Sequence, residues 1–215
     1  MQLIEKSLQI FLIRHGQSAW NGKKRITGQL DPPLSPKGVQ QSQNLARVLE
    51  HKTLSAIYTS SLSRAVETAR PTADQHGLAI HKRDALMELH FGVLQGKFRD
   101  HRDPETQALW NRRKENMIDF RVPGGETYRE LEQRVKPCLN QIIAQHEGRA
   151  VLIVGHRNTN RVILAALMDW PREVAIELNL RSKYLYEISS GKQPQLKTIC
   201  IDEKRLGREY AGFKM

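Results

Sequence analysis

The sequence predicts an α/β fold in which helices cover both faces of a mostly parallel central sheet. Short apolar runs alternate along the chain with longer segments of helical periodicity, the pattern of a layered α/β protein. The length of 215 residues fits one domain, and no internal repeat or low-complexity tract indicates another architecture. We therefore expect a single domain over residues 1–215, built as a three-layer sandwich.

The first half of the chain predicts two strands and two helices. Residues 8–13 and 56–58 are short apolar runs, which are typical of buried strands. A Ser-Pro pair at 35–36 opens the first helix, because serine caps a helix N-terminus and proline suits the first turn. Residues 62–76 have helical periodicity and are followed by glycine, which favours a helix end. Pro71 is expected to kink this second helix or to start its last part afresh.

The second half predicts two more helices and three more strands. A long amphipathic helix is expected over 126–145, with a bend at Pro137. The next helix is expected over 160–168, before a proline that ends it. The expected strands are the strongly apolar run 150–154 and a terminal pair, 184–188 and 196–201.

Two charged segments have weak periodicity. Within the middle of the chain, 84–123, we expect residues 89–122 to form a lid or an inserted lobe. The tail from Glu203 is expected to be loosely ordered, because it is charged and terminal.

Composition and charge narrow the classes of function. Lys and Arg number 34 against 23 Asp and Glu, and the net charge of +11 attracts anions. The basic clusters lack the interleaved aromatic residues of a nucleic-acid groove. Cys138 and Cys200 form neither a disulfide framework nor a CxxC motif, and no apolar run has the length of a membrane helix. We expect a cytoplasmic protein that needs no metal and binds neither nucleic acid nor membrane.

Two predicted strands end in histidine. The first runs into Arg14-His15-Gly16, and the strongly apolar strand runs into Gly155-His156. Ligands of open α/β sheets bind at the carboxyl ends of the strands. The two histidines, one beside an arginine, therefore predict one functional crevice.

Motifs in a fixed order extend this pattern over about residues 8–190. They are Leu12–Ser18 with Asn21, Thr27–Gln29, Asp31–Gly38, Thr59–Ala69 with Arg64, Leu86–Leu89 with Gly92 and Gly96, Pro123–Thr127, and Gly155-His156. Together they resemble the histidine phosphatase superfamily, which includes cofactor-dependent phosphoglycerate mutases and many small phosphatases. Each motif is weak, whereas the ordered set is highly specific.

The resemblance implies a role for each matching residue. His15 would attack phosphorus, while Arg14, Arg64 and His156 would hold the phosphoryl oxygens. Glu88 would act as the general acid. Further expected contacts to phosphate or substrate come from Asn21, Thr27, Gly28 and Arg157. No metal and no cofactor are expected, because arginine and histidine cations can stabilise a phosphoryl group themselves.

Two departures from the family pattern leave the subtype open. Arg157 stands where a small residue is common, and Gln95 stands where many phosphatases carry glutamate. The expected function is hydrolysis of a small anionic phosphorylated metabolite through a phosphohistidine. Leu89 and Phe91 replace the mutase-type Arg and Tyr, which disfavours the alternative of a phosphoglycerate mutase. The third hypothesis is a non-enzymatic module that binds a phosphorylated ligand or a nucleic acid. Such a module would not need Glu88, so the presence of this residue disfavours it. A monomer or a homodimer is expected.

Overall fold

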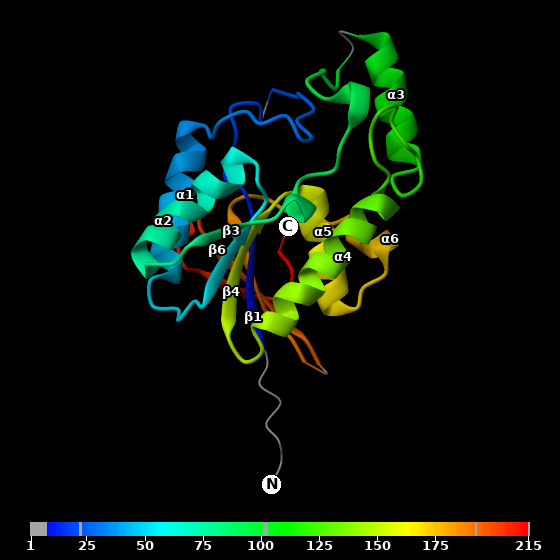
Figure 1. Ribbon diagram of the computed structural model, residues 1–215. Coiled ribbons are helices and arrows are strands. Elements are labelled where there is room, and N and C mark those ends of the chain that lie inside the picture. The colour runs from blue at the N-terminus through cyan, green and yellow to red at the C-terminus, as the bar shows by residue number, and fades with distance from the viewer. Residues whose placement is uncertain (1–7, 22, 101–102, 192, 215) are drawn as a thin grey trace.

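A seven-stranded sheet forms the centre of the molecule. The computed structural model describes residues 8–21, 23–100, 103–191 and 193–214. Within them the strand order is β3-β2-β4-β1-β5-β6-β7. The strands are β1 (Gln9–Arg14), β2 (Ala56–Thr59), β3 (Ile80–Lys82), β4 (Ala150–Gly155), β5 (Tyr184–Ser189), β6 (Gln195–Cys200) and β7 (Glu209–Ala211). The helices are α1 (Pro36–Leu49), α2 (Ser63–His76), α3 (Pro104–Glu115), α4 (Tyr128–Gln145), α5 (Arg157–Met168) and α6 (Arg172–Ala175) (Figure 1).

The predicted α/β fold is confirmed, with a mixed sheet. Strands β3, β2, β4 and β1 run parallel to one another, as expected of strands joined by helical crossovers. The other half, β5 to β7, is antiparallel. The register pairs Arg14, the last residue of β1, with Gly155, the last residue of β4. Residues that follow these two strands are therefore neighbours in space.

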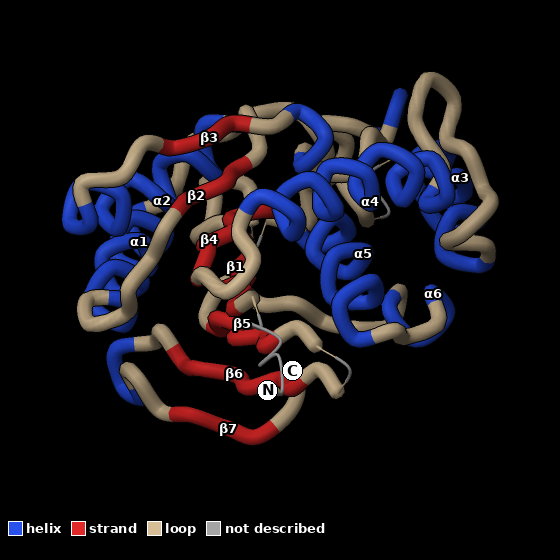
Figure 2. Tube along the Cα trace, turned by 60° about the horizontal axis from the view of Figure 1, so that its bottom comes forward, coloured by secondary structure: helices blue, strands red, loops and turns tan. Residues whose placement is uncertain are grey.

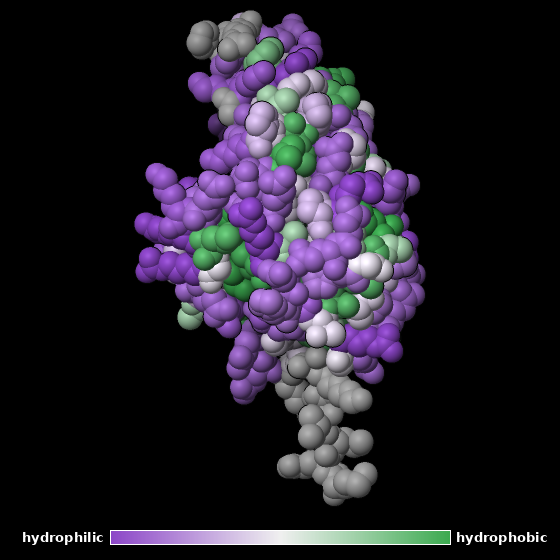
Figure 3. Space-filling model, turned by 90° about the vertical axis from the view of Figure 1, so that its left-hand side faces the viewer, coloured by the Kyte–Doolittle hydropathy of each residue, from purple (hydrophilic) through white to green (hydrophobic). Residues whose placement is uncertain are grey.

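Helices cover both faces of the sheet, as predicted. Alternate residues of β1 point to opposite faces: Phe11 and Ile13 pack in a core under α1 and α2, whereas Ile10 and Leu12 pack in a core under α4 and α5. The two helical layers lie on opposite sides of the strands in Figure 2. The outer face of the α1 and α2 layer is mostly hydrophilic (Figure 3), as expected of a surface in contact with water.

The elements expected from the sequence are present, with shifted ends. Helices α2 and α4 each include a proline, Pro71 and Pro137, within one continuous helix. Helix α5 begins at Arg157, three residues earlier than predicted, because its first turn is polar and carries no apolar periodicity. Among the described helices, none is both long and apolar enough to cross a membrane.

Four features were missed or wrongly predicted. The tail is not loosely ordered: its strand β7 pairs with β6, and Lys197 contacts Glu209 at 3.0 Å. Strand β3, the short helix α6 and helix α3 also went unpredicted. Helix α3 begins at an Asp103 cap followed by proline, and it projects away from the sheet at the upper right of Figure 1. These elements bury few apolar residues, so periodicity could not reveal them.

Candidate active site

The carboxyl ends of the central strands bring the two predicted histidines together. The backbone N–H of His15 donates to the carbonyl of Gly155 at 2.9 Å, and the rings of His15 and His156 lie 5.0 Å apart between centroids. The loop after β1 packs tightly on the start of α1, since a Cβ on Gly16 would lie 2.6 Å from the carbonyl oxygen of Gly38. Glycine is therefore needed at position 16 for this close approach.

Hydrogen bonds fix the tautomer of the buried His15. Its Nδ1 lies 2.7 Å from the carbonyl oxygen of Gly16, which only accepts, so Nδ1 carries the proton. Arg64 Nε donates to the other ring nitrogen, Nε2, at 3.3 Å. The Nε2 lone pair consequently faces the guanidinium groups, in the state that a nucleophile requires.

Arg64 is buried at the centre of the site. Besides His15, it donates to the carbonyls of Leu30 at 2.6 Å and Gly28 at 2.7 Å, to Asp31 at 3.3 Å, and to His156 Nδ1 at 3.3 Å. All five guanidinium N–H groups thus have an acceptor. A phosphoryl group that binds Arg64 must replace the histidine contacts, while the two backbone carbonyls hold the guanidinium in place.

His156 is fully buried against Arg64. Because Arg64 can only donate to its Nδ1, the proton of the neutral ring sits on Nε2 and donates to Ser60 Oγ at 2.7 Å. Burial first, and then the charges of Arg14 and Arg64, hold the pKa of His15 well below its ordinary value. Burial and Arg64 lower the pKa of His156 in the same way. Both rings are neutral at physiological pH.

These lowered pKa values predict that the protein loses stability in mild acid. Above about pH 6.5 both histidines are neutral in the folded and the unfolded chain. Below about pH 6.5, the unfolded chain binds protons that the folded chain excludes. The free energy of unfolding therefore decreases as the pH is lowered, by up to about 1.4 kcal/mol per pH unit for each histidine. Urea unfolding at pH 7.5 and 5.5 measures this difference. In His15→Ala, the difference in the free energy of unfolding between the two pH values is expected to be smaller than in the wild type. In the control His51→Ala, at an exposed position, the difference should stay the same. A free energy of unfolding that does not change with pH would contradict the prediction.

Glu88 lies across the site from His15. One carboxylate oxygen, Oε1, accepts from the N–H of Leu89 at 2.9 Å and from the backbone and side-chain nitrogens of Asn158 at 3.1 and 3.2 Å. Glu88 is 8 % exposed, so it is not a surface carboxylate. The other oxygen, Oε2, has no hydrogen-bond partner in the part of the chain that the structure describes.

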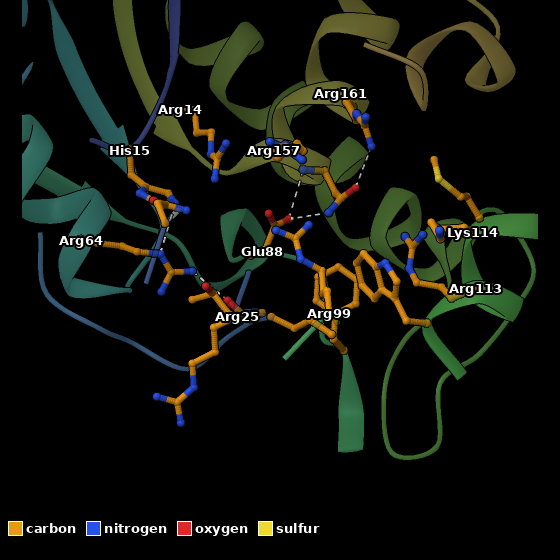
Figure 4. A pocket seen from close by; sticks show the side chains of 18 residues that line it. Arg14, His15, Arg25, Arg64, Glu88, Arg99, Arg113, Lys114, Arg157 and Arg161 are labelled. Carbon is orange, nitrogen blue, oxygen red and sulfur yellow. Dashed lines mark hydrogen bonds between the residues drawn. The ribbon is translucent and has the colours of Figure 1, made fainter. Parts of the chain in front are cut away.

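A cavity of about 290 Å³ joins these groups. The described residues that line it provide one carboxylate, from Glu88, and eight cationic side chains. The cations are Arg14, Arg25, Arg64, Arg99, Arg113, Lys114, Arg157 and Arg161 (Figure 4). Burial and nearby Arg157 lower the pKa of Arg14 to about 10, so Arg14 stays charged at neutral pH. Such a lining selects anions.

The other predicted contact residues also surround this cavity. Asn21, Thr27, Gly28 and Arg157 line it, whereas His156 lies behind Arg64 and outside the lining. Gly28 has a positive φ of 54°, and a Cβ there would lie 2.2 Å from Gln95 Oε1. The Gln95 side chain accepts from the N–H of Gln29 at 2.7 Å, so it supports the loop that carries Gly28.

Comparison with known proteins assigns the family. Residues 10–200 match the model of the histidine phosphatase superfamily (branch 1). The chain belongs to this superfamily. Proteins named probable phosphoglycerate mutase GpmB from Serratia proteamaculans and Yersinia pestis are 30% and 32% identical to it, and each alignment covers 91% of both chains.

Solved structures agree with this assignment. A mycobacterial glucosyl-3-phosphoglycerate phosphatase is 28% identical, with a TM-score of 0.76 over 87% of this chain and 96% of that one. The alpha-ribazole phosphatase of Shigella flexneri, at 24% identity, shares the fold, with a TM-score of 0.79 over 96% of this chain and 100% of that one. The protein is therefore an enzyme of the histidine phosphatase superfamily, either a phosphatase or a mutase.

Several residues of this superfamily site escaped the sequence analysis. Asn158 holds Glu88, and Arg161 donates to Asn158 Oδ1 at 3.1 Å. Arg113 enters the cavity from α3, which lies between the motifs and carries none of them. The position of Asn158, two residues after His156 at the start of α5, was the available signal for its role. No group of three or more potential metal ligands occurs among the described residues.

Arg134 of α4 fixes the segment that carries Glu88. Its guanidinium donates to the carbonyls of Ala85 at 2.8 Å, Met87 at 2.9 Å and Glu88 at 3.0 Å, and it pairs with Glu126 at 2.6 Å. No other described side chain contacts three carbonyls of this segment. Arg134 thus positions Glu88 without reaching the cavity.

Replacing Arg134 by glutamine is expected to destabilise the fold by about 2–4 kcal/mol, because three carbonyls each lose a hydrogen bond and the carboxylate of Glu126 loses its cation. The free energy of urea unfolding measures this loss. Exposed Arg70→Gln, on α2, is the matched control and should change stability by less than about 0.5 kcal/mol. Equal stability of Arg134→Gln and the wild type would refute the positioning role.

Proposed function

We propose that this protein is a metal-independent phosphomonoester hydrolase that acts on a small anionic phosphorylated metabolite through a phosphohistidine. The observation that carries the proposal is the orientation of His15, whose Nε2 lone pair points into a cavity lined by Arg14 and Arg64, with Glu88 across it. Arginine suits this role because its planar guanidinium binds phosphate through two parallel hydrogen bonds.

In the first step, His15 Nε2 attacks phosphorus and the bond from phosphorus to the ester oxygen breaks. Glu88 gives its proton to the leaving oxygen, so an alcohol departs and the phosphoryl group stays on His15. Arg14 and Arg64 stabilise the charge on the non-bridging oxygens. The carbonyl of Gly16 accepts a hydrogen bond from Nδ1–H and so stabilises the positive charge that the ring gains.

In the second step, water attacks the phosphoryl group and the bond from phosphorus to Nε2 breaks. Glu88, now a carboxylate, takes the proton of the water, and inorganic phosphate leaves. Neutral His15 and protonated Glu88 are restored. The unpartnered Oε2 of Glu88 is the oxygen available for both proton transfers, since Oε1 is occupied by Leu89 and Asn158.

Phosphoglycerate mutase is the second candidate, supported by the names of the relatives at 30% and 32% identity. A mutase returns the phosphoryl group to the substrate and must keep water out. Leu89 and Phe91 are buried beside the acid, where mutase-type Arg and Tyr would stand, and this favours the hydrolase. Residues 89–122, as a lid, would hold the substrate over His15 in either case.

Phosphate release from a panel of phosphomonoesters, with chelator present, tests the proposal. Release that withstands the chelator and is lost in His15→Ala is the expected result. Release abolished by the chelator would refute metal independence. Conversion of 3-phosphoglycerate to 2-phosphoglycerate, without phosphate release from any ester, would establish the mutase instead.

A further inference from the structure

Two parts of the chain hold the charged groups of the proposed reaction. The guanidinium of Arg64 is fixed by the carbonyls of Gly28 at 2.7 Å and Leu30 at 2.6 Å. Both residues belong to a turn over residues 27–30, which is closed by a 3.1 Å hydrogen bond from the N–H of Leu30 to the carbonyl of the first residue. We name residues 27–30 the Arg64 turn. Arg64 and Glu88 enter the cavity from different segments (Figure 4), so their spacing depends on the contacts between those segments.

Gln29 connects the Arg64 turn to the segment that carries Glu88. Its backbone N–H donates to Gln95 Oε1 at 2.7 Å, and its side-chain Nε2 donates to the carbonyl oxygen of Glu88 at 3.0 Å. Both acceptors lie within residues 88–95, which we name the acid segment. We propose that Gln95 and Gln29 are positioning residues, which fix the Arg64 turn against the acid segment. This inference rests on the proposed function, because both residues act through the same site.

Gln95 is placed to control the backbone of the Arg64 turn. A backbone N–H only donates, so the amide oxygen of Gln95 is the atom that faces Gln29. The same amide packs against Gly28, where an added Cβ would lie 2.2 Å from Oε1 and 2.8 Å from the amide carbon. Gln95 is not among the described residues that line the cavity. It therefore acts on the turn and not on the substrate.

Other contacts between these parts of the chain stop short of the Arg64 turn. The N–H of Ile26 donates to the carbonyl of Lys97 at 2.9 Å, and the N–H of Gly96 donates to the carbonyl of Ile26 at 2.7 Å. This pairing fixes the chain just before the turn. Among the described residues, Gln29 alone forms hydrogen bonds between the Arg64 turn and the acid segment. Without these bonds the turn can shift, and a small shift of a catalytic group slows a reaction that depends on orientation.

His90 indicates which side chains can replace Gln95. Its Nε2 lies 3.3 Å from Gln95 Nε2, and its Nδ1 lies 3.1 Å from the backbone nitrogen of Gly92, which donates to it. A neutral imidazole accepts at one nitrogen only, so with glutamine at position 95 one of these two contacts is unmet. A carboxylate at position 95 has two acceptor oxygens, one for the N–H of Gln29 and one for His90 Nε2–H. Gln95→Glu is therefore expected to keep the connection.

Steady-state kinetics of Gln95→Met tests the inference. Methionine is similar in size to glutamine, but its sulfur is only a weak acceptor. The kcat for glycerol 3-phosphate is expected to fall at least about fivefold, because both Arg64 and Glu88 are displaced. Gln95→Glu should keep kcat within about threefold of the wild type, since the acceptor oxygen is retained. A smaller fall in Gln95→Met, or a Gln95→Glu no faster than Gln95→Met, would overturn the inference.

Gln29→Met separates the two hydrogen bonds. It removes the donor to the carbonyl of Glu88 and keeps the backbone N–H that donates to Gln95. Its kcat for glycerol 3-phosphate is expected to fall at least about threefold, because the acid is displaced. Single-turnover release of nitrophenolate from p-nitrophenyl phosphate, which needs no proton from Glu88, should stay near the wild-type rate in Gln29→Met and slow in Gln95→Met. Equal slowing of both esters in Gln29→Met, or of neither, would overturn its role.

The matched control is Gln43→Met, at an exposed position of α1, which should keep both rates. Circular dichroism checks that each variant is folded, and Gln29→Met keeps the inference testable if Gln95→Met does not fold. Calorimetry with inorganic phosphate gives a readout without turnover. Gln95→Met should bind phosphate at least about threefold more weakly than Gln43→Met, because Arg64 has shifted, and equal Kd values would overturn the inference. If the wild type hydrolyses no ester but this difference in Kd stands, the proposed function fails and the positioning role of Gln95 holds.

Discussion

Replacing His15 by alanine is expected to lower kcat for p-nitrophenyl phosphate by at least about 10³-fold, because the atom that bonds to phosphorus is gone. The wild type, quenched in alkali during turnover, should carry an acid-labile, base-stable phosphoryl group on the peptide that contains residue 15. His15→Ala should carry none. The neighbouring arginines are unchanged in this variant, so phosphate is expected to bind to it still.

Exposed His51→Ala is the matched control and should keep the wild-type kcat. Phosphate release by His15→Ala at the wild-type rate would remove His15 from its assigned role. A stable phosphoryl group on another histidine would also contradict the role of His15. His156 is the first to check, because among the described residues it is the one histidine whose ring contacts that of His15.

The second large effect is expected from Glu88→Gln. Glutamine keeps an oxygen that can accept from Leu89 and Asn158, but it cannot hold and return a proton. For an alkyl ester such as glycerol 3-phosphate, whose alcohol must be protonated as it leaves, kcat should fall by about 10²–10⁴-fold. For p-nitrophenyl phosphate the leaving group needs no proton, so the first step should stay fast while the second slows.

Stopped-flow measurement should therefore show a burst of nitrophenolate equimolar with the Glu88→Gln enzyme, followed by slow turnover. Exposed Glu67→Gln, on α2, is the control and should behave as the wild type. If Glu88→Gln slowed both esters equally and gave no burst, Glu88 would not be the acid. The sensitivity to the leaving group distinguishes proton transfer from a purely structural role.

Local signals in the sequence were enough to predict the fold class and the centre of the site. The strands 8–13 and 150–154 could be predicted because they are nearly continuous apolar runs, which a strand needs when both faces of its sheet are buried. His15 and His156 follow these strands directly. Parallel pairing of the two strands then brings the histidines together, because strands in register end at the same edge.

The elements at the edge of the molecule could not be predicted in this way. Strand β7 is short and exposed, so its pairing with β6 depends on backbone hydrogen bonds and on contacts such as Lys197 with Glu209. Helix α3 has no apolar stripe, and few of its residues are buried. The expectation that the tail is loosely ordered was wrong, because its short strand β7 pairs with β6, the strand that precedes it in the chain.

By itself the sequence determined the layered α/β fold, the paired strand-end histidines and the residues His15, Arg64 and Glu88 as candidates. Only the tertiary structure decided the rest: the lone pair of His15 Nε2, the five acceptors around Arg64, and the position of Arg113 on two aromatic rings. The physical reason is the distance along the chain between the residues that interact. Strand and helix patterns depend on neighbours a few residues apart, whereas tautomers, unpaired charges and cavities depend on groups that folding alone brings together.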